Sequence, residues 1–272
     1  MFQTTKPSKP VYDGFIMQSL PRSGTALALD YTNGIGAFGH AQEYLNQRVI
    51  PYEAAENAEE HFQMAMKSAY NGADRFSMKL FPKQLLDCVD YHGYDFLSRC
   101  RNEYSILFVR LRRRDTIARA VSLFIALSND QWATDMERKV NDVPYEFQAI
   151  YKIWVFLIKA EAFWDAYNAD NEIEPIEFVY EALEEDPSQF GRKMCAIFDV
   201  DSKDMKPLRG INKQRNQRSE DYCARFRQEL ELDRYRDEFI DTDSGALELR
   251  KAPRTWGNLY RLVAQKPLQV RK

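Results

Sequence analysis

The sequence predicts an α/β fold, a P-loop-like parallel sheet with helices on both faces, and two observations lead to this prediction. Short apolar stretches with the length of buried strands alternate along the chain with longer stretches that suit helices. The first apolar stretch ends abruptly in the turn "PRSGT", residues 21–25, and a helix-compatible run follows directly. A strand, a tight turn and a helix form the usual cradle for phosphate, at the carboxyl end of the strand.

The individual elements follow from the same patterns. Short apolar stretches are interpreted as strands, and these are residues 15–20, 75–81, 104–111 and 173–183. Longer stretches with an apolar stripe, or apolar almost all round, are interpreted as helices, and these are residues 25–34, 53–70, 112–127, 145–167, 188–200 and 219–240. Because strands separated by helices pair in parallel, we expect the ends of the first three strands to converge on one site.

Composition narrows the class of protein. With 272 residues, 44% of them hydrophobic, the chain suits one domain over residues 1–240, followed by an extension of unclear structure at 241–272. The formal charge of −3 argues against binding to nucleic acid or to a membrane surface. The N-terminal residues 1–14 have no apolar core of signal-peptide length, and no run approaches the roughly 18 apolar residues of a membrane span, so we expect a cytoplasmic protein. The cysteines and histidines show no metal-binding spacing, and we expect no metal.

The turn after the first strand is a candidate anion site. Backbone amides at the start of a helix point at a common centre, and the helix dipole favours a negative charge there. Gly24 allows the backbone to approach a ligand closely, Ser23 and Thr25 add hydroxyl donors, and Arg22 adds a charged fork. The alternative is an ordinary strand-to-helix turn. A nucleoside triphosphate loop is not expected, because its first glycine and its lysine are both missing.

A second basic turn follows the strand at 104–111. Arg113 and Arg114 lie at the strand end, and Ser122 lies about two turns into the next helix. An arginine and the serine can therefore reach one further phosphate group, although a solvated basic turn is the alternative. Two anion sites at neighbouring strand ends indicate a ligand with two separated phosphate groups.

Six blocks of sequence occur in a recognisable order. They are "RSG" (22–24), "GHAQEYL" (39–45), "MKLF" (78–81), "RRDTIARAVS" (113–122) with Trp132, "YEALEEDP" (180–187) and "NQRSEDY" (216–222). Together they resemble the bacterial trehalose 2-sulfotransferase family, which uses 3′-phosphoadenosine 5′-phosphosulfate. Each block is weak alone, but six in order over roughly residues 12–236 are a strong signal. The resemblance implies the sulfotransferase fold and transfer of a sulfuryl group to a hydroxyl of a small carbohydrate or metabolite.

The resemblance also assigns the donor site. It implies that residues 22–26 bind the 5′-phosphosulfate and that Arg113 or Arg114, together with Ser122, binds the 3′-phosphate. Spacing does not decide between the two arginines. Arg218 is expected to close over the nucleotide, and a solvated arginine at a helix start is its alternative. By the same resemblance the protein can form a homodimer.

The chain departs from the family at a few positions. Thr25 and Ala26 stand where the family usually has Ser-Thr, so one loop hydroxyl is lost. His40 stands where the trehalose enzyme has a glutamate, and Ile125 replaces a commonly basic residue. These last changes fall in regions that meet the acceptor, so we do not expect trehalose itself to be the substrate.

Other residues are expected to contact the acceptor. His40 and Gln42 lie in the block that meets the sugar in the resembled family. Trp132 can stack on a sugar face, although burial in the core is an equally good interpretation.

The chemistry requires cations and a base. Sulfuryl transfer resembles phosphoryl transfer, so positive groups must stabilise the transferred group and a base must take the acceptor proton. Arg22 and Lys79, at a predicted strand end, are the expected cations, although Lys79 can also be a plain exposed lysine. The broader cytosolic sulfotransferases have Lys-x-His here, but Phe81 replaces that histidine. By resemblance Glu43 is the general base, with His40 as a competing base and a capping role for Glu43 as the alternative.

Two other functions are compatible with the motifs. A nucleotide-binding protein without transferase activity would keep the donor site and lack turnover. A small-molecule kinase would need ATP and Mg²⁺, and the missing loop lysine argues against it.

Overall fold

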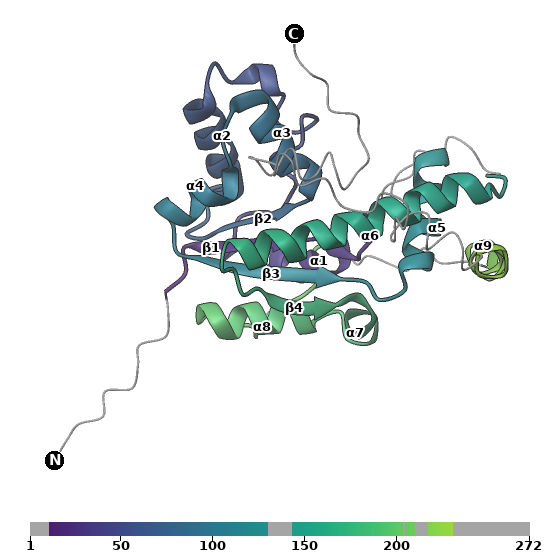
Figure 1. The fold of residues 1–272 in the computed structure, drawn as a ribbon. Helices are drawn as coiled ribbons and strands as arrows, with labels where there is room; N and C mark the ends of the chain where they lie inside the picture. The colour runs from purple at the N-terminus through teal and green to yellow at the C-terminus, as the bar shows by residue number, and fades with distance from the viewer. Residues whose placement is uncertain (1–10, 130–142, 204, 210–216, 231–272) are drawn as a thin grey trace, which may run out of the picture.

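The computed structural model describes residues 11–129, 143–203, 205–209 and 217–230 (Figure 1). Within them four strands form one sheet in the order β2-β1-β3-β4, with every neighbouring pair parallel. The strands are β1 (Gly14–Gln18), β2 (Phe76–Leu80), β3 (Ile106–Arg112) and β4 (Ile176–Val179). The predicted α/β fold with a parallel sheet is therefore confirmed.

Helices connect and cover the strands. They are α1 (Thr25–Ile35), α2 (Ala58–Tyr70), α3 (Pro82–His92), α4 (Phe96–Glu103), α5 (Thr116–Asn129), α6 (Phe147–Asp170), α7 (Tyr180–Glu185), α8 (Gln189–Phe198) and α9 (Gln217–Glu229), with a short 3₁₀ turn η1 at Tyr52–Ala54. Among the described residues, no helix is long and apolar enough to cross a membrane.

The two faces of the sheet carry separate hydrophobic cores. Successive residues of a strand point to opposite faces. Phe15 and Met17 of β1 therefore pack with α1, α7 and α8, whereas Ile16 packs with the cluster formed by α2 to α6. Figure 1 shows α6 running across one face of the sheet and α8 lying on the other side. Both faces are thus covered, as expected, and the strand ends are left to form a site.

Some boundaries differ from those expected from the sequence. The predicted helix 53–70 begins only at Ala58, because Asn57 adopts an extended backbone and its side chain accepts a hydrogen bond from the Glu60 amide (3.0 Å). Pro82 ends the strand, as predicted, but it also begins α3. Proline suits the first position of a helix, because its missing amide hydrogen would have no partner there. Helices α3 and α4 were absent from the sequence-based interpretation.

The last predicted strand is also shorter than expected. Only Ile176–Val179 of the segment 173–183 pairs in the sheet, and the chain turns into α7 at Tyr180. The predicted helix 219–240 corresponds to α9, which begins two residues earlier, at Gln217. Residues 231–240 and the extension 241–272 lie outside the described residues.

Candidate active site

The carboxyl ends of three adjacent strands meet directly after β1. The Ser19 amide donates a hydrogen bond to the Leu80 carbonyl at the end of β2 (3.1 Å), and the Ser19 hydroxyl donates to the Leu111 carbonyl of β3 (3.1 Å). One residue thus links all three strand ends. This is the convergence that the strand-helix alternation predicts.

The loop between β1 and α1 has a backbone shape that depends on glycine. Gly24 has φ of +86°, and a Cβ at this position would lie 2.2 Å from the ring of Tyr180. Arg22 also has positive φ (+62°), which is uncommon for a residue with a side chain. The first hydrogen bond of α1 runs from the Ala28 amide to the Gly24 carbonyl (3.0 Å), so the amides before Ala28 remain outside the helical ladder.

The two predicted anion motifs form one continuous group. Arg22 Nε donates to the Ser122 hydroxyl (2.9 Å), and Arg113 Nη1 donates to the Arg22 carbonyl (3.1 Å). Burial lowers the pKa of Arg22, and the nearby charge of Arg113 lowers it further. Two guanidinium groups therefore lie close together at the loop, which favours an anion between or beside them.

The two candidate arginines after β3 lie in different surroundings. Arg113 is half-buried, and its guanidinium lies 4.5 Å from the centre of the Tyr180 ring. Arg114 is exposed, and its backbone amide donates to Glu181 at the start of α7 (3.3 Å). The Arg113 side chain therefore faces the loop. The spacing in the sequence did not decide between Arg113 and Arg114.

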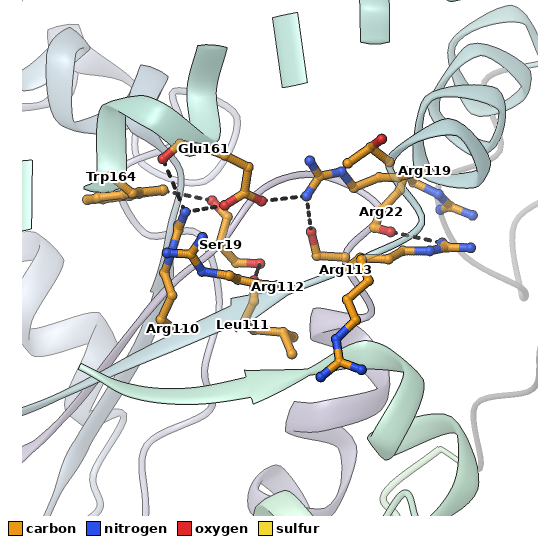
Figure 2. A network of polar contacts seen from close by, with 12 residues as sticks. Ser19, Arg22, Arg110, Leu111, Arg112, Arg113, Arg119, Glu161 and Trp164 are labelled. Carbon is orange, nitrogen blue, oxygen red and sulfur yellow. Dashed lines mark hydrogen bonds and ion pairs between the residues drawn. The ribbon is translucent and has the colours of Figure 1, made fainter. Parts of the chain in front are cut away.

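Behind the loop lies a buried group of charges that the sequence analysis did not identify. Arg110 of β3 and Arg119 of α5 are both fully buried, and both pair with Glu161 of α6. Figure 2 shows Glu161 between the two guanidinium groups. Arg119 Nη1 also donates to the Ser23 hydroxyl (3.3 Å). The sequence feature that could have revealed this group is the presence of charged residues inside otherwise apolar segments.

Glu43 and Lys79 form an ion pair at the end of β2. Lys79 Nζ lies 3.0 Å from Glu43 Oε1, and both side chains are about one-fifth exposed, at 21% and 22%. The other carboxylate oxygen, Oε2, accepts hydrogen bonds from Gln84 (2.8 Å) and Asn46 (3.1 Å). Gln84 and Asn46 were not predicted, and they orient the carboxylate.

The chain after α1 folds back along the outer edge of β2. It turns at Gly36, with φ of +77°, and Gln42 then forms a parallel bridge with Met78. The Lys79 amide donates to the Gln42 carbonyl (3.0 Å), which brings the next residue, Glu43, beside Lys79. Gly39 has no room for a side chain, because a Cβ would lie 1.7 Å from the Ala69 carbonyl oxygen. The glycine-containing segment 34–42 therefore returns to the end of β2.

A pocket opens beside Lys79. Its lining combines one side of α1, the returning segment and a short piece of chain before the undescribed residue 210: Ala26, Leu29, Asp30, Asn33, His40, Ala41, Gln42, Lys79, Leu208 and Arg209. Burial lowers the pKa of His40, and the charges of Arg209 and Lys79 lower it further. The pocket brings together His40, Gln42 and Lys79, three residues that the sequence analysis names as candidates. The sequence analysis missed Asp30, Asn33 and Arg209.

Two further predicted residues are Arg218 and Trp132. Arg218 is exposed in the first turn of α9, a helix that packs against α5. Trp132 falls outside the described residues. No cluster of His, Cys, Asp or Glu in the described part of the chain could hold a metal ion.

The chain is similar to known proteins over part of its length. Residues 99–229 match the family model described as Stf0 sulphotransferase. The chain is also 28% identical over 126 residues to a trehalose 2-sulfotransferase of Mycobacterium tuberculosis (strain ATCC 35801 / TMC 107 / Erdman), a match that covers 45% of this chain and 46% of the relative. The match thus spans about half the length of the relative. These findings confirm the resemblance, and the similarity to the Stf0 sulphotransferase model extends over residues 99–229 of this chain.

Proposed function

We propose that this protein transfers a sulfuryl group from 3′-phosphoadenosine 5′-phosphosulfate to a hydroxyl of a small carbohydrate or metabolite. The observation that carries the proposal is the Glu43–Lys79 pair, which lies at the end of β2 next to the strand that leads into the loop. The pair supplies a base and a cation, and a pocket for an acceptor opens beside the lysine. Sulfuryl transfer needs these groups together.

The donor end of the site is supported by the cation-rich loop. The free helical amides after Gly24, with Ser23 and Thr25, would hold the 5′-phosphosulfate. Arg113 is the better candidate than Arg114 for the 3′-phosphate, because its side chain faces the loop. Ser122 would complete this second site, and Arg22 would connect the two through its bond to Ser122.

The reaction follows from these positions. The acceptor oxygen attacks sulfur in line with the bond from sulfur to the 5′-phosphate oxygen, the new O–S bond forms, and adenosine 3′,5′-bisphosphate leaves. Lys79 moves from Glu43 to the sulfuryl oxygens and stabilises their charge. This movement frees Glu43 Oε1, which takes the acceptor proton and later releases it to water. Gln84 and Asn46 keep the carboxylate in place through Oε2.

His40 is the alternative base. It lines the acceptor pocket, and its pKa is lowered by burial and by the two neighbouring cations. A lower pKa leaves the imidazole neutral at physiological pH, but it also makes the group a weaker proton acceptor. We assign proton transfer to Glu43, because its carboxylate lies beside Lys79, the expected cation, and acceptor recognition to His40, which lines the pocket.

The test uses a donor labelled with radioactive sulfur and a panel of hydroxyl compounds. We expect label transfer with the unaltered protein and a fall of about 10²–10⁴ in rate for Glu43→Gln, with the affinity for adenosine 3′,5′-bisphosphate preserved. Glu59→Gln is the matched control, because Glu59 is a glutamate that pairs with Arg99 away from the pocket. Normal turnover of Glu43→Gln with collapse of His40→Gln would transfer the role of base to His40.

The same experiment separates the other functions. Binding of the bisphosphate without label transfer to any acceptor would favour a nucleotide-binding protein. Phosphate transfer from ATP that requires Mg²⁺ would favour a kinase. A cytoplasmic location and a homodimer remain part of the proposal, and light scattering of the purified protein tests the homodimer.

A further inference from the structure

We propose that Arg119 is a positioning residue for the sulfuryl donor, which orients the Ser23 hydroxyl toward the ligand and places a buried positive charge behind the loop. This inference rests on the proposed role of the loop in donor binding. It adds a residue that would not touch the donor itself and would act through Ser23.

The contacts of Arg119 are unusual for a structural ion pair. The side chain is fully buried, and its Nη1 donates to Glu161 Oε1 (2.5 Å) and to Ser23 Oγ (3.3 Å). Its Nε and Nη2 are buried without a hydrogen-bond partner in the described structure. Buried hydrogen-bond donors nearly always have an acceptor. Donors without one either lower the stability of the fold or find their acceptor when a ligand binds.

The hydrogen bond from Arg119 restricts the Ser23 hydroxyl. Ser23 Oγ accepts from Arg119, so its own hydrogen must point to a different acceptor. The Ser23 amide is already used, because it donates to the Leu20 carbonyl (3.3 Å). The hydroxyl is thus the group of Ser23 that remains for a ligand. A donor from a charged group also strengthens the outgoing hydrogen bond of the hydroxyl.

The local charge balance also favours a bound anion at the loop. Two fully buried arginines share one carboxylate, that of Glu161, which is only 17% exposed. One positive charge is therefore left without a counter-charge within this group, and Arg22 and Arg113 add two more at the loop (Figure 2). Buried charge without a partner is costly. A bound anion at the loop would offset that cost.

Arg110 provides a matched comparison inside the same group. It is equally buried and pairs with the same carboxylate, but it also contacts the Glu161 carbonyl and the Trp164 ring rather than the loop. Loss of Arg110 should therefore resemble loss of Arg119 in its effect on folding and differ from it in its effect on donor binding.

The experiment measures the dissociation constant of adenosine 3′,5′-bisphosphate and of 3′-phosphoadenosine 5′-phosphosulfate by calorimetry. We expect Arg119→Met to weaken donor binding by about 10- to 100-fold, as for the loss of a hydrogen bond that involves a charged group. We expect Arg110→Met to change donor binding by less than about threefold at a similar loss of thermal stability, and Arg119→Lys to recover part of the affinity.

A double-mutant cycle with Ser23→Ala tests whether Arg119 acts through the hydroxyl. In the Ser23→Ala background, the effect of Arg119→Met on donor affinity should shrink severalfold. Equal weakening by Arg119→Met and Arg110→Met, or full additivity with Ser23→Ala, would overturn the inference. If the Met variants do not fold, the pair Arg119→Lys and Arg110→Lys replaces them with the same criteria. Failure of the unaltered protein to bind either nucleotide would instead reject the proposed function.

Discussion

The donor loop and the acceptor pocket are built in different ways. The loop at residues 20–25 follows β1, which lies between β2 and β3, and it contacts Arg113 after β3, Ser122 of α5 and Tyr180 of α7. The pocket lies at the outer edge of β2, and much of its lining comes from the returning segment and from residues 208–209, which belong to no strand or helix. The sheet therefore supports the donor site, whereas much of the acceptor pocket depends on residues outside strands and helices.

Two glycines give the sharpest test of this difference. Gly39→Ala should force the returning segment away from Ala69, displace Glu43 from Lys79 and lower turnover by about 100-fold, because small misplacements of a catalytic group are costly. Donor affinity should stay normal. Gly24→Ala should instead weaken donor binding about tenfold, because Gly24 has a positive φ and a Cβ there would collide with the Tyr180 ring. Steady-state kinetics and calorimetry on both variants measure these effects, and a loss of donor affinity in Gly39→Ala would show that the two regions are coupled.

The neighbouring arginines test the donor side alone. Arg113→Ala should weaken binding of adenosine 3′,5′-bisphosphate by about 10- to 100-fold, since a charged hydrogen-bond donor beside the loop is lost. Arg114→Ala serves as the control and should have little effect, because Arg114 is exposed and donates to Glu181 through its backbone amide, which alanine keeps. The comparison also needs adenosine 5′-phosphosulfate, whose affinity should fall less in Arg113→Ala. The opposite ranking of the two variants would assign the 3′-phosphate to Arg114.

The acceptor side should respond to changes that leave donor binding alone. His40→Gln and Arg209→Gln should each raise the KM for the best acceptor by about tenfold, as expected for the loss of a polar contact. The donor dissociation constant should not change. Trehalose should not be the best acceptor, since His40 and Ile125 differ from the resembled enzyme. Turnover of trehalose above every other compound in a broad screen would contradict this prediction.

Protonation of a histidine outside both regions should change the free energy of unfolding and leave donor binding unchanged. His61 is fully buried and contacts the Tyr94 hydroxyl (2.8 Å), and burial, with a smaller contribution from His92, lowers its pKa to about 4. In the unfolded chain the pKa is about 6.5, so the unfolded state binds the proton more tightly between these values. The stability gained from a neutral, buried His61 is fully present above about pH 6.5. The free energy of unfolding should fall by roughly 2–3 kcal/mol as the pH drops toward 4.

Chemical denaturation at several pH values measures this loss. His61→Phe should flatten the pH dependence in this window, while donor affinity at neutral pH stays unchanged. An equally steep pH dependence in His61→Phe would show that other groups cause the loss. A change in donor affinity would show that the α2–α4 region is coupled to the site.

The sequence alone determined the parts that depend on neighbouring residues. The strand, the turn at 21–25 and the following helix could be predicted because apolar periodicity and the place of Gly24 are local properties. The order of strands and helices then predicted a parallel sheet and a site at its carboxyl edge. The turn at Tyr180 and the cap at Asn57 were missed, because several backbone conformations suit the same short segments.

Only the tertiary structure decided which side chains meet. Arg22 and Ser122 are 100 residues apart in the sequence, Ser23 and Arg119 are 96 apart, and Glu43 and Gln84 are 41 apart. Sequence patterns report on residues within a few turns or strand positions of one another, whereas these contacts depend on how β1, β2 and β3 align in the sheet. The alignment brings Arg113 to the loop rather than Arg114, and it buries Arg119 behind Ser23. The charges that would hold and position the donor are therefore set by packing between distant elements.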